Sequence, residues 1–184
     1  MKKFLFYAVL VLGGMNLYSC SSSRKVEKSP IKTFVMPCSD LVSGDGVLRA
    51  WASGKSDSEM AARKKAQVAA SAELAAMLEK TVKATTEDYT ASLSESEMGA
   101  SKSLLVEKTN VAVNQSLKGA AIVCDRWVKD ETSGQYTNYL VMELRGEEYL
   151  NTLYEELSKN GNVSVDKELL KELFFKYIEE NINK

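Results

Sequence analysis

Histidine is absent from this chain of 184 residues, and proline, tryptophan and cysteine are scarce, at two, two and three residues. Without imidazole groups the chain cannot build Ser-His-Asp or Cys-His nucleophile systems, or the common imidazole zinc sites. It also lacks an excess of either charge, because 24 basic residues balance 25 acidic ones. Nucleic-acid binding usually requires a concentrated basic surface, so we expect no nucleic-acid partner. What remains is an ordinary globular composition, 45% hydrophobic and 27% charged.

The amino-terminal residues have the layout of an export signal. Two lysines at positions 2 and 3 precede an apolar run over residues 4–12, which is shorter than the roughly 20 residues of a membrane-spanning helix. This pattern predicts a cleaved signal over residues 1–19. The sequence LYSC, which ends at Cys20, resembles the bacterial lipobox. That resemblance implies that the Cys20 sulfur carries a diacylglycerol. After cleavage, the new amino group of Cys20 would carry a further fatty acyl chain such as palmitate. Two or more acyl chains give lasting membrane attachment, so Cys20 is predicted to be an anchor and not a catalyst.

Residues 20–33 are predicted to be the lipidated cysteine and a flexible tether. The stretch SSSRKVEKSPIKT is polar and has no apolar period, so it cannot bury enough surface to offset its ordering entropy. By analogy with lipoprotein sorting, Ser21 after the cysteine favours the outer membrane over retention at the inner one. The lack of an acid-rich run after Cys20 favours the leaflet that faces the periplasm. We therefore expect a cell-envelope protein whose membrane contact is its lipid anchor.

Two further cysteines, Cys38 and Cys124, fit an exported protein, because disulfides persist outside the cytoplasm. Cys38 lies in a loop, MPCSD, before the folded domain, and Cys124 lies in an apolar strand. A disulfide between them would tie the loop onto a sheet and contribute about 4 kcal/mol in the chain-entropy model. The alternative is two unpaired cysteines, one of them simply buried by packing.

The pattern of the central region predicts an α+β domain over residues 34–160. GVLRAWASG, at 46–54, alternates a small apolar face with larger residues and predicts a strand. SDSE, at 56–59, matches a capping box and predicts the start of a helix, which should run to about Leu93 before a bend near Gly99. The inward stripe of this helix consists mostly of small residues: Ala62, Ala66, Ala69, Ala70, Leu74 and Met77.

A second helix is expected over residues 102–117, with Leu104 and Val111 facing inward. Residues 120–129 and 135–144 are rich in β-forming side chains and flank a turn, DETSG, which predicts a hairpin. A hairpin is not stable alone in water, so it should pair with the first strand under the long helix. The predicted architecture is a small antiparallel or mixed sheet of about three strands, covered by the alanine-rich helix, with additional C-terminal helices.

The carboxy-terminal region predicts two amphipathic helices, GEEYLNTLYEELSKN and a last one within residues 161–184 that starts at a Ser164 cap. Asn160 and Gly161 form a stop signal between them. We expect the apolar stripes of these helices to pack on the body of the same molecule. The alternative is that the last helix is a docking face for a protein partner or for a second copy in a homo-oligomer.

The packing residues of the central region also carry a resemblance, which covers roughly residues 47–144. The matching positions are Ala52, Gly54, Ser56, Ala62, Ala66, Ala70, Leu74, Gly119, Ala120, Ile122 and Trp127. Together they resemble the LPP20 family of bacterial lipoproteins. That resemblance implies a compact α+β domain in an envelope protein, with roles in membrane integrity, adhesion or, in relatives, the flagellar basal region. It implies no reaction, cofactor or metal, and the carboxy-terminal segment lies outside it.

Three motifs that suggest enzymes have simpler interpretations. GKS at 54–56 would need a glycine where Arg49 stands to form a phosphate-binding loop. Ser164 and Lys167 have S-x-x-K spacing, but the companion motifs are missing and a helix cap is favoured. The acidic pairs, Glu87 with Asp88 and Glu95 with Glu97, are typical of a solvated face, and Glu73 is expected at an exposed rim. Trp51 is expected to pack on Trp127 or Tyr139.

These observations favour a lipid-anchored envelope protein with a non-catalytic structural or interaction role, without catalytic residues, cofactor or metal. The alternative is a periplasmic module that binds a small ligand or the cell wall in a cleft between the sheet and the long helix. A hydrolase that uses carboxylates alone is the weakest hypothesis. Biological role, partner, oligomeric state and strand order do not follow from the sequence.

Overall fold

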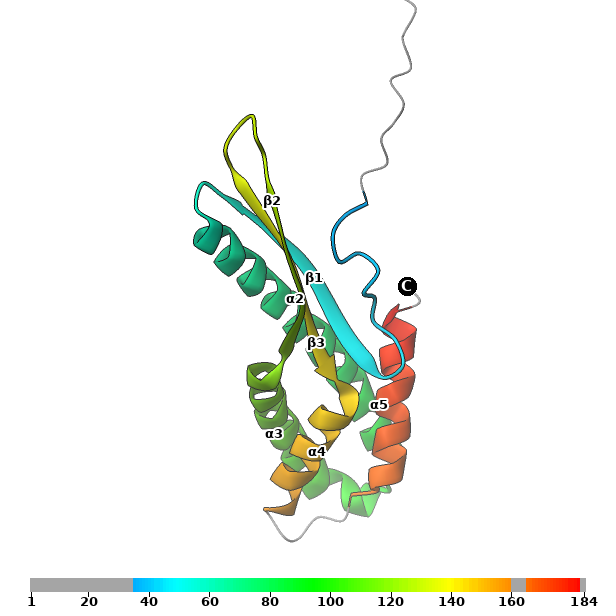
Figure 1. The fold of residues 1–184 in the computed structure, drawn as a ribbon. Coiled ribbons are helices and arrows are strands. Elements are labelled where there is room, and N and C mark those ends of the chain that lie inside the picture. The colour runs from blue at the N-terminus through cyan, green and yellow to red at the C-terminus, as the bar shows by residue number, and fades with distance from the viewer. Residues whose placement is uncertain (1–34, 160–164, 183–184) are drawn as a thin grey trace, which may run out of the picture. The chain divides into compact units, whose positions relative to one another are not determined.

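The computed structural model describes residues 35–159 and 165–182, so the predicted signal, Cys20 and the tether lie outside the described residues. Figure 1 shows the order of the elements. They are β1 (Val47–Ser56), α2 (Glu59–Ala91), α3 (Glu95–Gly119), β2 (Ala121–Lys129), β3 (Tyr136–Arg145), α4 (Gly146–Ser158) and α5 (Lys167–Ile182). A three-stranded antiparallel sheet with a long helix and C-terminal helices confirms the predicted α+β class.

β3 is the central strand, with β1 on one side and β2 on the other, and both pairings are antiparallel. β2 and β3 form the predicted hairpin. Its turn is held by Asp130, whose carboxylate accepts hydrogen bonds from the backbone N–H groups of Thr132 (2.9 Å) and Ser133 (3.2 Å). A hydrogen bond from the Ser133 side chain, together with these two backbone bonds, stabilises the charged form and holds the pKa of Asp130 below its usual value.

The long helix α2 packs on the sheet through small residues. Leu48, Ala50 and Ala52 are buried on the predicted face of β1. The apolar side chains of α2 that are fully buried recur every four residues: Ala62, Ala66, Ala70, Leu74 and Leu78. A β carbon on Gly54 would stand only 2.2 Å from the carbonyl oxygen of Ala62. The two backbones are therefore in direct contact here, and the space between them is filled.

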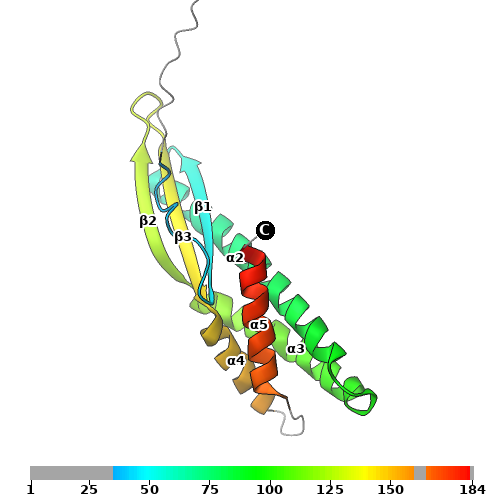
Figure 2. The same cartoon turned by 90° about the vertical axis from the view of Figure 1, so that its right-hand side faces the viewer.

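Beyond the sheet, α2 packs with α3 and α5, and α4 packs with α3 (Figure 2). Tyr149 of α4 stacks on Phe174 of α5, with ring centroids 4.8 Å apart. The apolar stripes of both C-terminal helices are buried around this pair: Leu150, Leu153, Leu157, Leu170 and Ile178. The expected packing of these helices on the body of the same molecule is confirmed.

The predicted capping box is wrong, although the helix does begin at Glu59. Ser56 is the last residue of β1 and stands opposite Tyr136, so its backbone belongs to the sheet. Ser58 takes the N-cap position instead, without a hydrogen bond from its side chain. The local motif was overridden because the strand runs two residues further than the sequence pattern indicated.

The break between the first two helices also differs from the prediction. α2 ends at Ala91, near the predicted position, but the bend precedes Gly99, because α3 already begins at Glu95. Ser92 explains the earlier break: its hydroxyl donates to the carbonyl oxygen of Tyr89 at 2.6 Å and competes for the last helical acceptors.

Two details of the predicted helix faces are also corrected. Ala69, expected in the inward stripe of α2, is exposed. Leu104 and Val111 of α3 are half-buried, while Leu105 and Ala112 next to them are buried. In both helices the pattern found the correct face but misplaced its centre by about one residue.

The start of α5 is capped by a residue that the sequence analysis did not single out. The Asp166 carboxylate accepts from the backbone N–H groups of Glu168 and Leu169, both at 3.1 Å, as an N-cap does. The backbone N–H of Asp166 donates to the Tyr89 hydroxyl of α2 at 2.8 Å, which ties the start of α5 to the long helix. Ser164, Asn160 and Gly161 lie outside the described residues.

Candidate functional site

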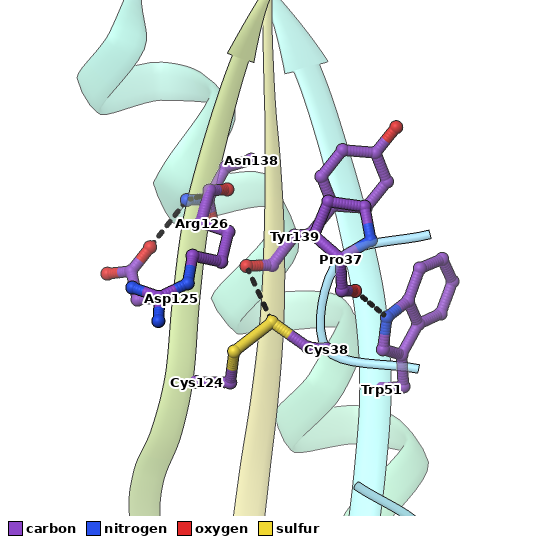
Figure 3. The surroundings of a disulfide bond; sticks show 8 residues. All are labelled: Pro37, Cys38, Trp51, Cys124, Asp125, Arg126, Asn138 and Tyr139. Carbon is purple, nitrogen blue, oxygen red and sulfur yellow. Dashed lines mark hydrogen bonds between the residues drawn. A yellow bond between two sulfur atoms is a disulfide. The ribbon is translucent and has the colours of Figure 1, made fainter. Parts of the chain in front are cut away.

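Cys38 and Cys124 are joined in a disulfide, with α carbons 6.1 Å apart across a separation of 86 residues (Figure 3). Cys124 stands opposite Val141 of β3, on the face of the sheet that points away from α2. Cys38 belongs to the segment 35–46, which precedes β1. The disulfide therefore fastens this entry segment, residues 35–46, onto the outer face of the sheet.

Hydrogen bonds hold the entry segment on the same face. The indole N–H of Trp51 donates to the Pro37 carbonyl oxygen at 3.1 Å, and the Arg49 guanidinium donates to the Val42 carbonyl oxygen at 2.7 Å. Arg49 also forms an ion pair with Glu143 of β3, with Nε and Oε2 2.8 Å apart. The outward side chains of β1 thus donate hydrogen bonds to backbone carbonyl groups of the entry segment. These bonds take the place of the hydrogen bonds that the carbonyl groups would otherwise form with water.

Beneath the entry segment the sheet carries an aromatic pair and a buried valine. Trp51 and Tyr139 have ring centroids 6.0 Å apart, which confirms the expected packing of Trp51 on Tyr139. Val141, which stands opposite Trp51 in the central strand, has no exposed surface. Cys38 is buried and has a φ of 66°, an uncommon backbone conformation for a residue other than glycine. The disulfide and the surrounding contacts hold this conformation in place.

An open cleft of about 390 Å³ lies at the edge of this arrangement. Two of the apolar side chains that line it are exposed, Met36 and Val42. Its only described charged lining residue is Arg49, which is already paired with Glu143. The cleft therefore offers apolar surface but no free charged group for catalysis.

A second open cleft, of about 440 Å³, lies between α2 and α3. Its floor combines valines with Thr86, Thr90 and Thr109. The Thr90 hydroxyl donates to the Glu87 carbonyl oxygen at 3.0 Å, and that of Thr109 to the Val106 carbonyl oxygen at 2.9 Å. These hydroxyls are occupied by their own helices. The alternative hypothesis placed a cleft between the sheet and the long helix, but the small residues of α2 and Gly54 fill that interface.

The motifs that suggested enzymes are used structurally where the structure describes them. Gly54, Lys55 and Ser56 lie within β1 and do not form a phosphate-binding loop. Asp88 accepts a hydrogen bond from the Tyr177 hydroxyl and lies 3.6 Å from the Lys176 ammonium group, so it fastens α5 to α2. Glu73 is exposed, as expected. Within the described ranges, no group of three or more acidic or cysteine side chains could hold a metal ion.

Two buried hydroxyls in the helices have no hydrogen-bond partner among the described residues, that of Ser116 in α3 and that of Tyr149 in α4. Tyr149 is the larger of the two side chains and the more deeply buried. Its side chain is 1% exposed, and burial raises its pKa above the usual range. Nearby, burial and then the charges of Glu168 and Glu147 raise the pKa of Tyr154 to about 12. These shifts come from packing between α4 and α5 rather than from a polar site.

Replacing Tyr149 by phenylalanine should stabilise the protein, because it removes an unpaired hydroxyl and keeps the ring that stacks on Phe174. We expect the free energy of unfolding at pH 7 to rise by about 1 kcal/mol. A raised tyrosine pKa stabilises the fold fully below the unfolded value of about 10, and this stability is lost as the pH rises above it. The variant should therefore also lose less stability than wild type between pH 10 and 11, as measured by urea denaturation.

Tyr136→Phe is the matched control, because Tyr136 is only half-buried. Its urea midpoint should stay close to that of wild type at both pH values. Destabilisation of Tyr149→Phe by more than 1 kcal/mol would contradict the assignment and would indicate that the Tyr149 hydroxyl has a partner in solution.

The contacts around the disulfide were only partly accessible from the sequence. The cysteine count pointed to Cys38 and Cys124, and strand alternation placed Arg49 and Trp51 on one face. The Ser43 hydroxyl, which binds the backbone of Arg49, had no sequence signal because isolated serines are common in loops.

Comparison of this chain with family models, with curated proteins and with solved structures found no match. In the part of the chain that the structure describes, no helix has both the length and the apolar character of a membrane span.

Proposed function

We propose that this protein is a lipid-anchored component of a bacterial cell envelope, held at the outer membrane and facing the periplasm, with a non-catalytic structural or interaction role. The observation that carries the proposal is the disulfide between Cys38 and Cys124. It belongs to an oxidising compartment and lies directly after the predicted tether. Residues 34–37 alone separate the tether from Cys38.

The position of the disulfide suits a domain that is held by its amino terminus. A pull on Cys20 would pass along the tether and reach the folded domain at Cys38. Because Cys38 is bonded to β2, the load would enter the sheet through a covalent bond and would not peel the entry segment from β1. The hydrogen bonds of Trp51 and Arg49 to this segment add further attachment points.

Two further arguments support a role through contacts. The packing residues between 47 and 144 resemble the LPP20 family of envelope lipoproteins. The interface between α2 and the sheet is filled by small side chains, as expected for a rigid module rather than for a ligand-binding cleft there.

A second candidate is a module that binds a small apolar ligand or a cell-wall component. The cleft of about 440 Å³ between α2 and α3 favours it, because its volume lies in the range of ligand sites. This candidate would share the lipid anchor and differ in having a bound molecule. The apolar stripe of α5 is buried within the molecule. A protein partner of this helix would therefore have to bind its outward, polar side, and such a partner stays a proposal.

The proposal is tested by following the lipid. The full chain, expressed in a diderm bacterium fed labelled palmitate, should incorporate the label and sediment with the outer membrane. Cys20→Ser should lose the label and leave the outer-membrane fraction. The double variant Cys38→Ser/Cys124→Ser is the control for general loss of cysteine and should keep the label. An unprocessed amino terminus on the wild-type chain, or a label that survives Cys20→Ser, would refute the anchor.

A further inference from the structure

The two edges of the sheet are treated differently. Along the free edge of β1, the Ser43 hydroxyl accepts from the Arg49 backbone N–H at 2.7 Å and donates to the Arg49 carbonyl oxygen at 3.1 Å. Further along, the Lys65 ammonium group donates to the Lys55 carbonyl oxygen at 3.0 Å. Side chains thus occupy backbone groups that another strand would need, which is a common way to protect an edge.

The free edge of β2 has no such protection among the described residues. The Asp130 N–H donates to the Gln135 carbonyl oxygen at 2.8 Å, so the backbone groups of Asp130 point toward β3. Backbone direction alternates along a strand in an antiparallel pair. The N–H and C=O groups of Asp125, Trp127 and Lys129 therefore point away from β3, and no described residue binds them.

Apolar side chains accompany this open edge. Val123 and Val128 are 41% and 37% exposed. α2 packs under β1 and β3 and reaches β2 only at its margin, through the ion pair of Arg63 with Asp125 at 2.7 Å. Trp127, on the same side of β2 as α2, is consequently only half-buried. An open, partly apolar edge of this kind is a template for another strand.

We infer that β2 is a self-association edge, at which a second copy of this chain adds its own β2 in antiparallel orientation to form a continuous six-stranded sheet. A bulge between Ile122 and Cys124 ends the regular part of the strand, so the pairing uses the stretch from Cys124 to Asp130. The inference goes beyond the proposed function and does not depend on the lipid anchor, because it concerns only the folded domain.

Charge and the length of the paired stretch together select one register for this pairing. Two strands related by a two-fold axis must pair residues that lie on the same face, which allows axes at Asp125, Arg126, Trp127 or Val128. An axis at Asp125 places two carboxylates opposite each other, and an axis at Arg126 places two guanidinium groups together. An axis at Trp127 instead places each Asp125 opposite the other copy's Lys129, and the two indoles meet at the centre. An axis at Val128 also pairs opposite charges, Arg126 with Asp130, but it shortens the paired stretch to residues 126–130 and leaves Asp125 outside it. The register centred on Trp127 is therefore the one that joins opposite charges over the longer stretch.

The same register also satisfies the backbone. Asp125, Trp127 and Lys129 all direct their N–H and C=O groups to the free edge, so these three positions form hydrogen-bonded pairs across the axis. About six backbone hydrogen bonds would join the two copies. The backbone groups of all three positions would then have partners. The registers centred on Asp125 and Arg126 oppose like charges, and the register centred on Val128 leaves the groups of Asp125 out of the pairing.

Cysteine crosslinking of the full chain in detergent tests the register. α carbons in a hydrogen-bonded antiparallel pair lie about 5.5 Å apart, within disulfide range. Trp127→Cys should therefore give a disulfide-linked dimer on non-reducing electrophoresis. Arg126→Cys places its two thiols diagonally, about 7–8 Å apart between α carbons, and should crosslink far less. The unsubstituted chain, with its three native cysteines, sets the baseline.

A charge change tests the pairing without touching the tryptophan. Lys129→Glu places a carboxylate opposite Asp125 twice per dimer and should weaken dimerisation about tenfold in sedimentation equilibrium. Lys64→Glu, the same charge change at an exposed position of α2, should leave the dissociation constant unchanged. A wild-type chain that stays monomeric at all concentrations would overturn the proposal. So would stronger crosslinking of Arg126→Cys than of Trp127→Cys, or crosslinking of Trp127→Cys to a different protein.

Discussion

Replacing Gly54 by valine is expected to prevent the domain from folding. An added β carbon would stand 2.2 Å from the carbonyl oxygen of Ala62 and 2.6 Å from the backbone nitrogen of Ala66. Both atoms belong to the backbone of a helix, so they cannot rotate away as the end of a side chain would. Relief requires α2 to move off the sheet, which would expose the fully buried leucines Leu74 and Leu78.

The expected cost is large relative to the stability of a domain. Overpacking in a core costs about 1–3 kcal/mol when side chains can adjust, and here the rigid helix backbone leaves less room for adjustment. We expect Gly54→Ala to lose about 3 kcal/mol in urea denaturation and Gly54→Val to lack the cooperative transition. A domain typically has only about 5–15 kcal/mol of stability in total.

Gly44→Ala is the matched control, because a β carbon at Gly44 meets no atom within 4 Å. It should unfold at nearly the wild-type urea concentration. If Gly54→Val gave a wild-type midpoint instead, the close contact between β1 and α2 would not exist in solution.

The parts of the fold that were predictable are those with a local period. Alternation in β1 and recurring alanines in α2 each indicate one buried face, and the DETSG turn marks a hairpin without reference to distant residues. Where the prediction was wrong, a distant element decided. Ser56 has the spacing of a helix cap, but pairing with Tyr136, far along the chain, keeps it in the strand.

The position of the helix break depends on a side chain that competes for backbone hydrogen bonds. Glycine weakens a helix, so the sequence favours a break near Gly99, but α2 ends earlier, where the Ser92 hydroxyl bonds to the Tyr89 carbonyl oxygen. The cap at Asp166 also depends on Tyr89, which receives its backbone N–H. A three-residue spacing can suggest such bonds, but only the arrangement of the helices shows which of them form.

Only two features of the contacts that hold the entry segment could be predicted, the pair of cysteines and the face of β1 that carries Arg49 and Trp51. Two cysteines besides Cys20 suggest a disulfide, and strand alternation places Arg49 and Trp51 on one face. The carbonyls that they bind, at Val42 and Pro37, belong to a loop without periodicity. The open edge of β2 also needed the strand order, because a sequence does not tell a central strand from an edge strand.

Removing the disulfide is expected to cost the protein about 4 kcal/mol. The bond closes a loop of 86 residues. In the chain-entropy model, a loop of this length lowers the conformational entropy of the unfolded chain and so raises its free energy by roughly that amount. The double variant Cys38→Ser/Cys124→Ser should therefore unfold at a much lower urea concentration than wild type. The part of the entry segment around Cys38 should also become more accessible, because the hydrogen bonds that would still hold residues 37–43 to β1 are those of Trp51 to Pro37 and of Arg49 to Val42 and Ser43.

A reducing agent separates the effect of the bond from that of the serine side chains. It should lower the wild-type urea midpoint toward that of the double variant and leave the double variant unchanged. Tryptophan fluorescence should shift in the same experiment, because Trp51 hydrogen-bonds to Pro37, the residue before Cys38. A wild-type midpoint that is insensitive to reduction would mean that the entry segment is held by its hydrogen bonds alone. The disulfide would then not be the point at which the folded domain takes the load of the proposed tether.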